Sequence, residues 1–483
     1  MCRKMYDRHR EGLLIMYQID FNKPEHVHFI GIGGISMSGL AEILLDEGFS
    51  ISGSDSHETA LTEHLETKGA RVYYGQRAAN IEREPGISVV VYTAAIHEDN
   101  PEFRAARDQG LPMLSRAELL GELMRNYKEA IAISGTHGKT TTTSMLTDIL
   151  LAGDLDPTIS VGGILKDIGG NIRVGGPDLF VTEACEYTNS FLSFYPTMEV
   201  ILNVEEDHLD FFKDIEDIRH SFRLFAEKLP AKGLLVVNSG IEKVEEITRG
   251  LRCRVVTFGK DLSSTYTACN ITYDGFARPS YDLVIQGETV SRITLGVTGE
   301  HNVYNSLAAI AIALELGVGF DAIMSGLGRF TGTDRRFEKK GEVAGVTVID
   351  DYAHHPQEIK ATLAAARNYP HRKLWCVFQP HTYTRTRAFL DQFAEALSAA
   401  DEVVLADIYA ARETDTLGVS SRDVADRIEK LGTKAHYIPS FDEIETFILE
   451  NCMNGDLLIT MGAGDIVKVG EKLLGQLLST LST

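Results

Sequence analysis

The sequence predicts an α/β protein of three successive domains, each built on a largely parallel sheet with helices on its faces. Short apolar runs typical of strands alternate with helical patterns along the chain, and this alternation is characteristic of parallel sheets. Two glycine-rich loops each lie between such a run and a helix. The 483 residues fit about three domains of roughly 100–200 residues each. We expect domains at residues 16–124, 125–335 and 336–483, after a disordered extension at residues 1–15.

The individual elements follow from periodicity. In the first domain we expect strands at residues 26–32, 50–53, 71–74 and 87–93, helices at 37–46, 60–68 and 101–108, and a strand end with a connecting helix at 114–126. In the second we expect strands at residues 130–133, 179–182, 200–204 and 234–237, a helix at 141–151, a small antiparallel excursion between 255 and 295, and a closing helix at 303–316. In the third we expect strands at residues 346–349, 374–378, 402–405, 436–438 and 457–460, with helices at 357–367, 388–399 and 466–481.

Composition restricts the classes of function. With 69 acidic and 47 basic residues the net charge is −22, which argues against a nucleic-acid-binding protein because phosphates need a basic face. The six cysteines are scattered, with no C-x-x-C pair, as is usual in a reduced compartment. No apolar run approaches the ~18 residues of a membrane span. We therefore expect a cytoplasmic protein without membrane insertion.

A first glycine-rich loop, Gly31-Ile32-Gly33-Gly34-Ile35-Ser36, follows the first strand and precedes a helix. Glycines at such a turn let backbone N–H groups approach a diphosphate at the helix N-terminus. Asp55 lies 24 residues beyond Gly31, where a dinucleotide-binding fold places its ribose-binding acid, but Ser36 replaces the third glycine of that fingerprint. The loop predicts a nucleotide diphosphate, either NAD or another; a tight turn needed only for packing is the alternative.

A second loop, Ser134-Gly135-Thr136-His137-Gly138-Lys139-Thr140, joins an apolar strand to an amphipathic helix. Successive backbone N–H groups can hold phosphates there, Lys139 can reach the β- and γ-phosphates, and the Thr140 hydroxyl can bind Mg²⁺. Ile133 stands where the strict spacing requires glycine, so the loop is a shortened variant. It predicts binding of ATP or GTP.

Carboxylates and imidazoles follow two strands of the same domain. Glu183 and Glu186 come just after one apolar run, and Asp207 and His208 just after the next. In an open α/β sheet the carboxyl ends of the strands face the ligand crevice. Each residue alone is a common solvated loop charge. Near a phosphate loop, they predict Mg²⁺ held on the substrate side of the γ-phosphate.

Two further segments leave their alternatives open. Residues 299–305 begin a helix, and capping by Asn302 accounts for them as well as ligand contacts by His301 or Asn305 do. Residues 333–337, with two arginines, lie at a domain boundary. A hinge there would move the arginines towards phosphates, whereas solvated linker charges are the alternative.

Histidines cluster at the ends of two strands of the third domain. Residues 350–356 and 379–387 each follow a strand that we expect to neighbour the other, and they carry histidines together with aspartates or arginines. Buried core histidines usually occur singly, so the clustering predicts one wall of a site. Arg385 or Arg387 would bind a carboxylate there in a bidentate manner.

In combination, these motifs resemble those of the Mur ligases, ATP-dependent amide-forming enzymes of peptidoglycan assembly. The resemblance extends from about residue 16 to the C-terminus. The matching motifs are His28-Phe29-Ile30-Gly31-Ile32-Gly33-Gly34, Gly135 to Thr140, Asp207-His208, His301-Asn302 with Asn305, Asp350 to Pro356, Phe378-Gln379-Pro380-His381 and Gly462-Ala463-Gly464-Asp465. Each motif alone is weak, but seven in this order are specific.

The resemblance implies a Rossmann-like UDP-binding domain, a central P-loop domain for ATP and Mg²⁺, and a Rossmann-like domain that binds the amino acid. The motifs are most similar to those of the members that join L-alanine to UDP-N-acetylmuramate. An acyl phosphate on the lactyl carboxylate would be the intermediate. A monomer or weak homodimer is expected, without nucleic acid or membrane partners. Cys185 replaces an acid common after Glu183, and Thr382 replaces a second arginine, so the carboxylate clamp depends on Arg385.

The resemblance also implies roles for individual residues, which group by ligand. The UDP-sugar would contact Gly31, Gly33, Gly34, Ser36, Met37, Ser38, Ser54, Asp55, Thr93, Ala94, Ala95 and Glu186. ATP would contact Gly135, Thr136, His137, Gly138, Lys139, Thr140, Thr141, His301, Asn305, Arg336 and Asp350. The amino acid would lie among Tyr352, His354, His381 and Arg385, and the metal ions among Thr140, Glu183 and His208. Catalysis would involve Lys139, His208, His354 and Arg385.

Three alternative functions stay open on the sequence. A sister ligase that recycles murein tripeptide would share every motif. A nicotinamide-dependent dehydrogenase would fit Gly31 to Asp55 but would leave the loop around Lys139 without a role. A non-catalytic P-loop regulator would bind ATP without releasing phosphate.

Overall fold

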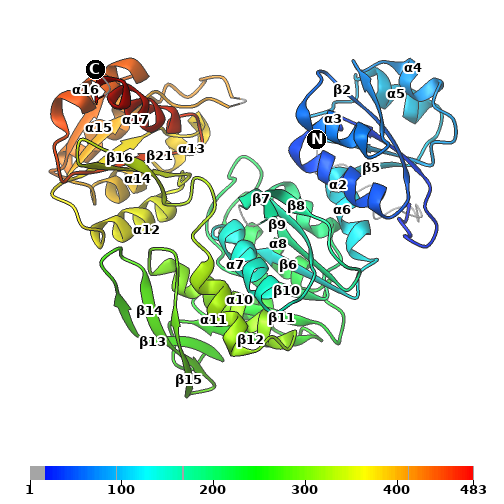
Figure 1. Cartoon of the computed structure of the whole chain (residues 1–483), viewed down its shortest axis with the longest axis horizontal. Coiled ribbons are helices and arrows are strands. Elements are labelled where there is room, and N and C mark those ends of the chain that lie inside the picture. Colours follow the sequence, from blue (N-terminus) through cyan, green and yellow to red (C-terminus); the bar gives the residue numbers. More distant parts are fainter. Residues whose placement is uncertain (1–16, 94, 166–167, 412, 482–483) are drawn as a thin grey trace. The chain divides into compact units, whose positions relative to one another are not determined.

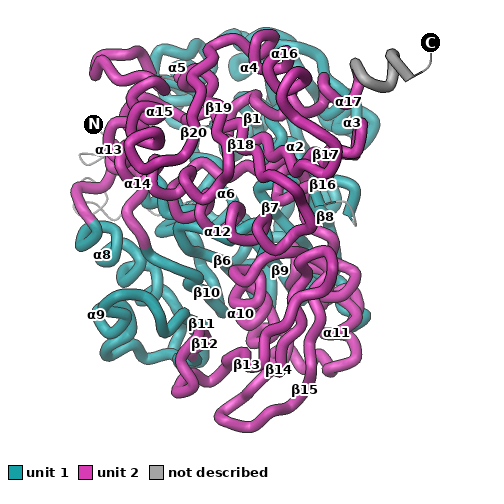
Figure 2. The backbone as a smooth tube through the Cα atoms, turned by 90° about the vertical axis from the view of Figure 1, so that its left-hand side faces the viewer, with its two compact units in different colours: residues 1–143, 153–204, 215–256 teal, residues 144–152, 205–214, 257–483 magenta. Residues whose placement is uncertain are grey.

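The computed structural model describes residues 17–93, 95–165, 168–411 and 413–481. The expected extension at residues 1–15 and the expected ligand residue Ala94 therefore lie outside the described residues. The chain divides into two compact units, one of residues 1–143, 153–204 and 215–256 and the other of residues 144–152, 205–214 and 257–483 (Figure 2). Strands form three separate sheets, as expected for a three-domain α/β protein.

The N-terminal sheet is fully parallel, with the order β3-β2-β1-β4-β5. Its strands are β1 (His26–Ile30), β2 (Ser50–Asp55), β3 (Arg71–Tyr74), β4 (Val89–Tyr92) and β5 (Met113–Ser115). Its helices are α2 (Ile35–Asp46), α3 (Ala60–Thr67), α4 (Ala78–Glu82), α5 (Pro101–Asp108) and α6 (Arg116–Met124). The central strand β1 is buried along its whole length, as expected for a parallel strand covered on both faces.

The central sheet is mixed, with the order β15-β14-β13-β12-β11-β10-β6-β9-β7-β8. Its strands are β6 (Glu129–Ser134), β7 (Thr158–Leu165), β8 (Gly170–Arg173), β9 (Leu179–Ala184), β10 (Met198–Ile201), β11 (Leu234–Asn238), β12 (Arg254–Gly259), β13 (Tyr266–Tyr273), β14 (Pro279–Ile285) and β15 (Glu288–Thr294). The parallel part contains β6, β9, β10 and β11. Strands β13 to β15 are antiparallel and form the excursion expected from the two-residue period.

Helical elements of this region are α7 (Lys139–Ala152), the 3₁₀ helix η2 (Tyr187–Ser193), α8 (Ile215–Ala226), α9 (Val244–Thr248), α10 (His301–Glu315) and α11 (Phe320–Arg329). Figure 1 labels α7, α8, α10 and α11. The expectation that the helix at 303–316 closes the domain is wrong, because α11 follows it. Helix α11 packs so closely that a Cβ on Gly326 would lie 2.6 Å from the Ile149 Cα atom. A glycine that permits helix contact weakens the helical signal in the sequence.

The C-terminal sheet is mixed, with the order β16-β17-β21-β18-β19-β20. Its strands are β16 (Glu338–Val343), β17 (Val346–Asp351), β18 (Leu374–Phe378), β19 (Glu402–Leu405), β20 (Lys434–Tyr437) and β21 (Leu457–Met461), of which only β16 is antiparallel to its neighbour. Its helices are α12 (Pro356–Arg367), α13 (Tyr383–Ala388), α14 (Leu390–Leu397), α15 (Ser421–Lys430), α16 (Phe441–Asn451) and α17 (Val467–Leu481).

The helix expected at 388–399 is present as α14 (Leu390–Leu397). A further helix that was not expected, α13, precedes it, and the two are separated at Phe389, where the backbone leaves the helical region with φ −113° and ψ 23°. The Phe389 side chain is buried in the core, so packing accounts for the break. One expectation for this domain is wrong: the strands that precede residues 350–356 and 379–387 are not neighbours, because β21 lies between them.

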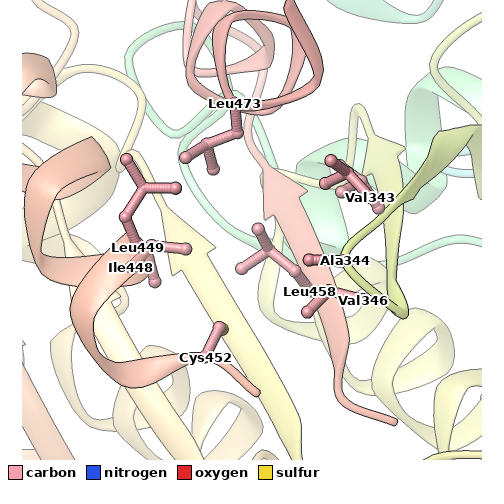
Figure 3. A pocket seen from close by; sticks show the side chains of 9 residues that line it. Val343, Ala344, Val346, Ile448, Leu449, Cys452, Leu458 and Leu473 are labelled. Carbon is pink, nitrogen blue, oxygen red and sulfur yellow. The ribbon is translucent and has the colours of Figure 1, made fainter. Parts of the chain in front are cut away.

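Alternate residues of one strand divide the C-terminal core into two layers. Leu374, Cys376 and Phe378 of β18 belong to one buried apolar cluster, and Trp375 and Val377 belong to the other, because successive side chains of a strand point to opposite faces. The second cluster contains an apolar pocket (Figure 3), lined by Val343, Ala344, Val346, Val348, Ile448, Leu449, Cys452, Leu458 and Leu473. With no charged or hydroxyl group in this lining, the pocket offers no acid, base or phosphate ligand.

Within the described part of the chain, none of the helices combines the length and the apolar character that crossing a membrane requires.

Two glycines of α11 provide a matched test of this packing. In Gly326→Ala, the added methyl group would lie 2.6–2.8 Å from backbone atoms of Ile149 and Asp148, so we expect a loss of about 1–3 kcal/mol in the free energy of unfolding. In Gly328→Ala the methyl group meets no described atom within 4 Å, and we expect a gain of up to about 1 kcal/mol. Urea denaturation of the two variants measures both changes, and equal stability would contradict the packing of α11.

Candidate active site

The first glycine loop connects β1 to α2, and its glycines are required by close contacts. Gly31 has φ +87°, and a Cβ there would lie 2.7 Å from Cγ2 of Thr93. A Cβ on Gly33 would lie 2.9 Å from Oδ2 of Asp55. The Asp55 carboxylate accepts hydrogen bonds from the Gly33 N–H at 2.8 Å and the Ser56 N–H at 2.7 Å. Asp55 therefore fixes the shape of the loop.

The other residues expected to bind the UDP-sugar differ in burial. Ser36 is partly exposed, whereas Met37 and Ser38 are buried in α2. Ser54 is fully buried, and its hydroxyl donates to Glu102. Its backbone carbonyl accepts the N–H groups of Gly31 and Ile32 at 2.8 and 2.9 Å. Ser54 thus supports the loop, and direct contact of these residues with UDP stays a prediction.

A buried polar network below this loop was missed by the sequence analysis. The Nδ1 of His26 lies 3.1 Å from the carbonyl oxygen of Pro85, so Nδ1 carries the proton, and His26 Nε2 accepts from the Ser52 hydroxyl at 2.8 Å. Ser52 Oγ then accepts from His28 Nδ1 at 2.8 Å. Nε2 of His28 faces the Glu102 carboxylate at 3.4 Å. The signal in the sequence is the alternation of two histidines within the apolar run of β1.

The second glycine loop joins β6 to α7 and holds the ammonium group of Lys139 in place. Lys139 Nζ donates to the carbonyl oxygen of Gly135, to that of Thr136 at 3.0 Å and to the Glu186 carboxylate at 3.1 Å. A lysine has three N–H donors, and these three acceptors match them. Burial opposes the charge of Lys139, but the nearby Glu186 carboxylate more than compensates and raises its pKa. Lys139 is therefore a fixed positive charge.

Asn203, which the sequence analysis missed, shapes the same loop. It follows β10, the neighbour of β6. Its side chain accepts from the His137 N–H at 2.7 Å and donates to the His137 carbonyl oxygen at 3.1 Å, and its backbone carbonyl accepts from the Thr136 N–H at 3.2 Å. A Cβ on Gly135 would lie 2.9 Å from Cβ of Leu202. The loop is thus fitted against the end of β10.

Thr140 and Glu183 form a pair of oxygen ligands beside Lys139. The Thr140 hydroxyl donates to Glu183 Oε2 at 3.1 Å, and the Gly162 N–H donates to Oε1 at 2.6 Å. Hydroxyl and carboxylate oxygens are the ligands that Mg²⁺ prefers, so these residues fit a magnesium ion. Lys139, Thr140, Glu183 and Glu186 all belong to the same unit, and the structure brings them together as the sequence predicted.

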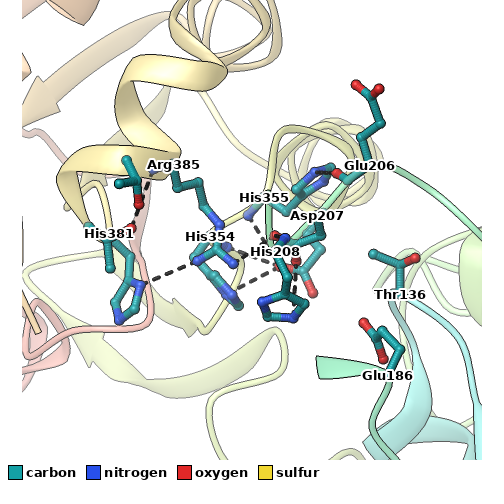
Figure 4. A network of polar contacts seen from close by, with 12 residues as sticks. Thr136, Glu186, Glu206, Asp207, His208, His354, His355, His381 and Arg385 are labelled. Carbon is teal, nitrogen blue, oxygen red and sulfur yellow. Dashed lines mark hydrogen bonds and ion pairs between the residues drawn. The ribbon is translucent and has the colours of Figure 1, made fainter. Parts of the chain in front are cut away.

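A second polar cluster lies in the other unit and contains Asp207, His381 and Arg385 (Figure 4). Arg385 Nη2 donates to Asp207 Oδ1 at 2.8 Å, and both side chains are about nine-tenths buried, with exposed fractions of 10% and 8%. Burial alone would raise the pKa of Asp207, but the Arg385 guanidinium outweighs this effect and holds the pKa well below its usual range. Arg385 Nη1 also lies 3.3 Å from His381 Nδ1. Arg387 of the same helix is exposed.

The turn after β17 positions His354 and His355. Asp351 accepts the Ala353 N–H at 2.7 Å and the Phe337 N–H at 2.9 Å, and burial raises its pKa to about 6. His355 caps α12, and its Nε2 lies 3.0 Å from the Glu206 carbonyl oxygen. His354 Nδ1 lies 3.0 Å from the Tyr352 carbonyl oxygen, and desolvation lowers its pKa to about 4. His354 is therefore neutral near pH 7.

His354 also adjoins the cluster of Asp207, His381 and Arg385, since its ring centroid lies 5.8 Å from that of His381. Tyr352 stacks edge-on against His354 at 5.4 Å. The four residues expected to bind the amino acid, Tyr352, His354, His381 and Arg385, therefore lie together. Their contact with an amino acid stays a prediction. His208 has the strained φ of +52° and donates its N–H to Asp207 at 2.7 Å, and its role as a metal ligand likewise stays a prediction.

The other residues expected to bind ATP differ in their burial and contacts. His301 is exposed at the start of α10, whereas Asn305 is buried and donates to Asn302 at 3.0 Å. The Arg336 guanidinium lies 5.3 Å from the centre of the Tyr352 ring. Asp350 is fully buried, and its carboxylate accepts from Arg335 at 2.9 Å and from Thr460 at 2.7 Å. These contacts account for Asp350 structurally, and its contact with ribose stays a prediction.

Three consecutive parts of the chain match models of known protein families. Residues 26–128 match the model of the Mur ligase family, catalytic domain. Residues 133–313 match the Mur ligase middle domain. Residues 335–464 match the Mur ligase, glutamate ligase domain.

Individual relatives match this chain over nearly its full length. A protein of Lachnospira eligens named UDP-N-acetylmuramate–L-alanine ligase is 64% identical over 460 residues, which cover 95% of this chain and 100% of that protein. The crystal structure of the UDP-N-acetylmuramate-alanine ligase of Thermotoga maritima is 30% identical, covers 94% of this chain and 100% of its own, and has a TM-score of 0.76. A murein peptide ligase of Psychrobacter arcticus is 25% identical, covers 94% and 98%, and has a TM-score of 0.65. The chain belongs to the Mur ligase family.

Proposed function

We propose that this chain joins L-alanine to the lactyl carboxylate of UDP-N-acetylmuramate and converts ATP to ADP and phosphate. The observation that carries the proposal is the loop between β6 and α7, which holds the charged Lys139 next to Thr140 and Glu183. The near full-length identity of 64% with a ligase of that name supports the choice of substrates. Membership of the Mur ligase family leaves the dehydrogenase alternative without support.

The chemistry requires activation of the carboxylate, because hydroxide is a poor leaving group. Transfer of the γ-phosphoryl group of ATP to the lactyl carboxylate gives an acyl phosphate and ADP. The amine of L-alanine then attacks the acyl carbon, and the tetrahedral intermediate expels phosphate. The protein contributes mainly by positioning the reactants and neutralising charge.

Lys139 has to exchange an acceptor when ATP binds. Its three donors point to Gly135, Thr136 and Glu186, and the two carbonyls belong to the loop itself. We expect a phosphate oxygen to replace the Glu186 carboxylate, because two anions repel each other at one ammonium group. Thr140 and Glu183 would hold Mg²⁺, which supplies positive charge at the β- and γ-phosphates when it is bound.

The amino acid would bind at the cluster of the other unit. Arg385 would hold its carboxylate, with the guanidinium shared between the ligand and Asp207. His354 is neutral near pH 7, since desolvation lowers its pKa to about 4. A neutral imidazole can accept a hydrogen bond from the incoming amine and orient it.

We also propose the domain limits 16–124, 125–335 and 336–483, a cytoplasmic location and a monomer or weak homodimer.

Phosphate release tests the proposed reaction directly. We expect the full chain with ATP and Mg²⁺ to release phosphate only when both UDP-N-acetylmuramate and L-alanine are present. Replacing L-alanine with murein tripeptide should abolish release, and activity with the tripeptide alone would favour the recycling ligase. No release with either amine would contradict the proposal and would favour a non-catalytic regulator.

For the phosphate loop, we expect Lys139→Ala to lower turnover by roughly 10²-fold or more, as for the loss of one preorganised charge at a developing negative charge. Lys128→Ala is the matched control, since Lys128 is exposed and lies just before β6, at the end opposite to Lys139. Steady-state phosphate release measures both variants. Near-normal turnover of Lys139→Ala would refute the role of this loop.

For the amino-acid cluster, we expect Arg385→Lys to raise the KM for L-alanine at least about tenfold while changing that for ATP much less. Lysine keeps the charge that Asp207 requires but loses the bidentate fork. Arg387→Lys is the control, because Arg387 is exposed on the same helix. Equal increases in both KM values would remove Arg385 from the alanine site.

A further inference from the structure

Arg116 lies at the edge of the N-terminal sheet that carries the first glycine loop. It follows β5, which is parallel to β4 with Ser115 opposite Tyr92. Thr93 directly follows β4, and its methyl group lies against Gly31. Because the carboxyl ends of parallel strands share one edge, Arg116 is in the ligand crevice of this sheet.

The helix that begins at Arg116 packs against η2, the 3₁₀ helix that follows Glu186. Helix α6 packs on η2 so tightly that a Cβ on Gly121 would lie 2.0 Å from the carbonyl oxygen of Ser193. The segment 183–186 directly precedes η2 in the chain, and its Glu186 contacts Lys139. Arg116 is the first residue of the helix that starts at the edge of the N-terminal sheet and packs against η2.

The Arg116 side chain is partly buried, and no partner for its guanidinium lies among the described residues. Burial lowers the pKa of this side chain. Among the residues that the structure describes, none accepts a hydrogen bond from it or forms an ion pair with it. Arg125, at the other end of α6, differs in this respect, because it pairs with Glu122 at 3.7 Å and lies 4.4 Å from the centre of the Tyr195 ring.

Arg116 is unfavourable for the fold in two ways. A cation in the first turn of a helix opposes the helix dipole, and a desolvated charge without a partner loses hydration without compensation. Ser115 and Glu118 already form the capping box of α6, so Arg116 adds nothing to the cap. A bidentate oxyanion would offset both costs.

We propose that Arg116 binds an oxyanion of the sugar nucleotide on its path from the first glycine loop to the segment 183–186. This inference rests on the proposed function, in which the acid of the sugar must reach the γ-phosphate near Lys139. Two groups of that substrate have the required chemistry, the diphosphate and the lactyl carboxylate. Both present paired oxygens that match a guanidinium.

Binding measurements without ATP test the inference independently of turnover. We would titrate the full chain and its Arg116→Gln variant calorimetrically with UDP, UDP-N-acetylglucosamine and UDP-N-acetylmuramate. We expect Arg116→Gln to weaken binding of UDP-N-acetylmuramate about tenfold or more. A loss confined to this ligand identifies the lactyl carboxylate, which UDP-N-acetylglucosamine lacks, and a similar loss with all three identifies the diphosphate.

Arg125→Gln is the matched control, since it removes the same charge just beyond the C-terminal end of α6, and we expect it to leave all three affinities within about twofold. The midpoint of thermal unfolding separates binding from structure: we expect Arg116→Gln to be as stable as the parent chain or more so. Unchanged affinity for UDP-N-acetylmuramate would overturn the inference, as would a loss of stability in parallel with the loss of affinity. A parent chain that binds no UDP-N-acetylmuramate would instead contradict the proposed function.

Discussion

The structure of the nucleotide site depends on the need to satisfy the hydrogen bonds of a largely buried ammonium group, that of Lys139. Lys139 directs its donors to two carbonyl oxygens of its own loop and to Glu186, so the loop must turn those carbonyls inwards. Gly135, with φ +138°, allows this turn. The Asn203 side chain fixes it by accepting from the His137 N–H and donating to the His137 carbonyl oxygen. The N–H groups of Thr136 and His137 and the carbonyls of residues 135–137 are then held in place before a phosphate arrives. Little reorganisation is left for the reaction itself, which is how electrostatic preorganisation lowers a barrier.

The sheets explain why residues far apart in the sequence form sites. Parallel strands deliver their following loops to one edge, so Gly31, Asp55 and Thr93 meet at the edge of the first sheet although three different strands precede them. The same rule operates in the C-terminal sheet even where the expected adjacency is wrong. There β21 separates β17 from β18, yet Arg335 bridges Asp350 of β17 to the carbonyls of Gly462 and Gly464 after β21.

Strong local signals allowed much of the fold to be predicted from the sequence. The limits of β3, α5, β18 and β19 agree with expectation, because cap residues or apolar runs mark their ends. Strands β7 and β8 and helix α11 were not predicted, since glycines at 162, 163 and 326 are selected by contacts with distant residues. Asn203 and the network from His26 to Glu102 were not predicted either, because their hydrogen-bond partners are distant in the sequence. A polar residue that bonds to a remote backbone has no periodicity, whereas Lys139 and Thr140 lie in a short motif with a known mechanism.

The number of N–H donors that already have an acceptor in the protein distinguishes the cations of this fold better than their distance from a site does. Arg335 uses Nε, Nη1 and Nη2 on Asp350 and two carbonyls, so its charge serves the fold. Arg385 uses Nη2 on Asp207 and can share the guanidinium with a second carboxylate. Lys139 is fully engaged, but one of its acceptors is a side-chain carboxylate that an incoming phosphate can displace. Arg116 has no acceptor among the described residues. A buried charge without a partner is unfavourable. The series Arg335, Arg385, Lys139, Arg116 therefore runs from a structural cation to a ligand-binding one. Arg116, which belongs to neither the glycine loop nor the phosphate loop, has the greatest need for an anion from a ligand.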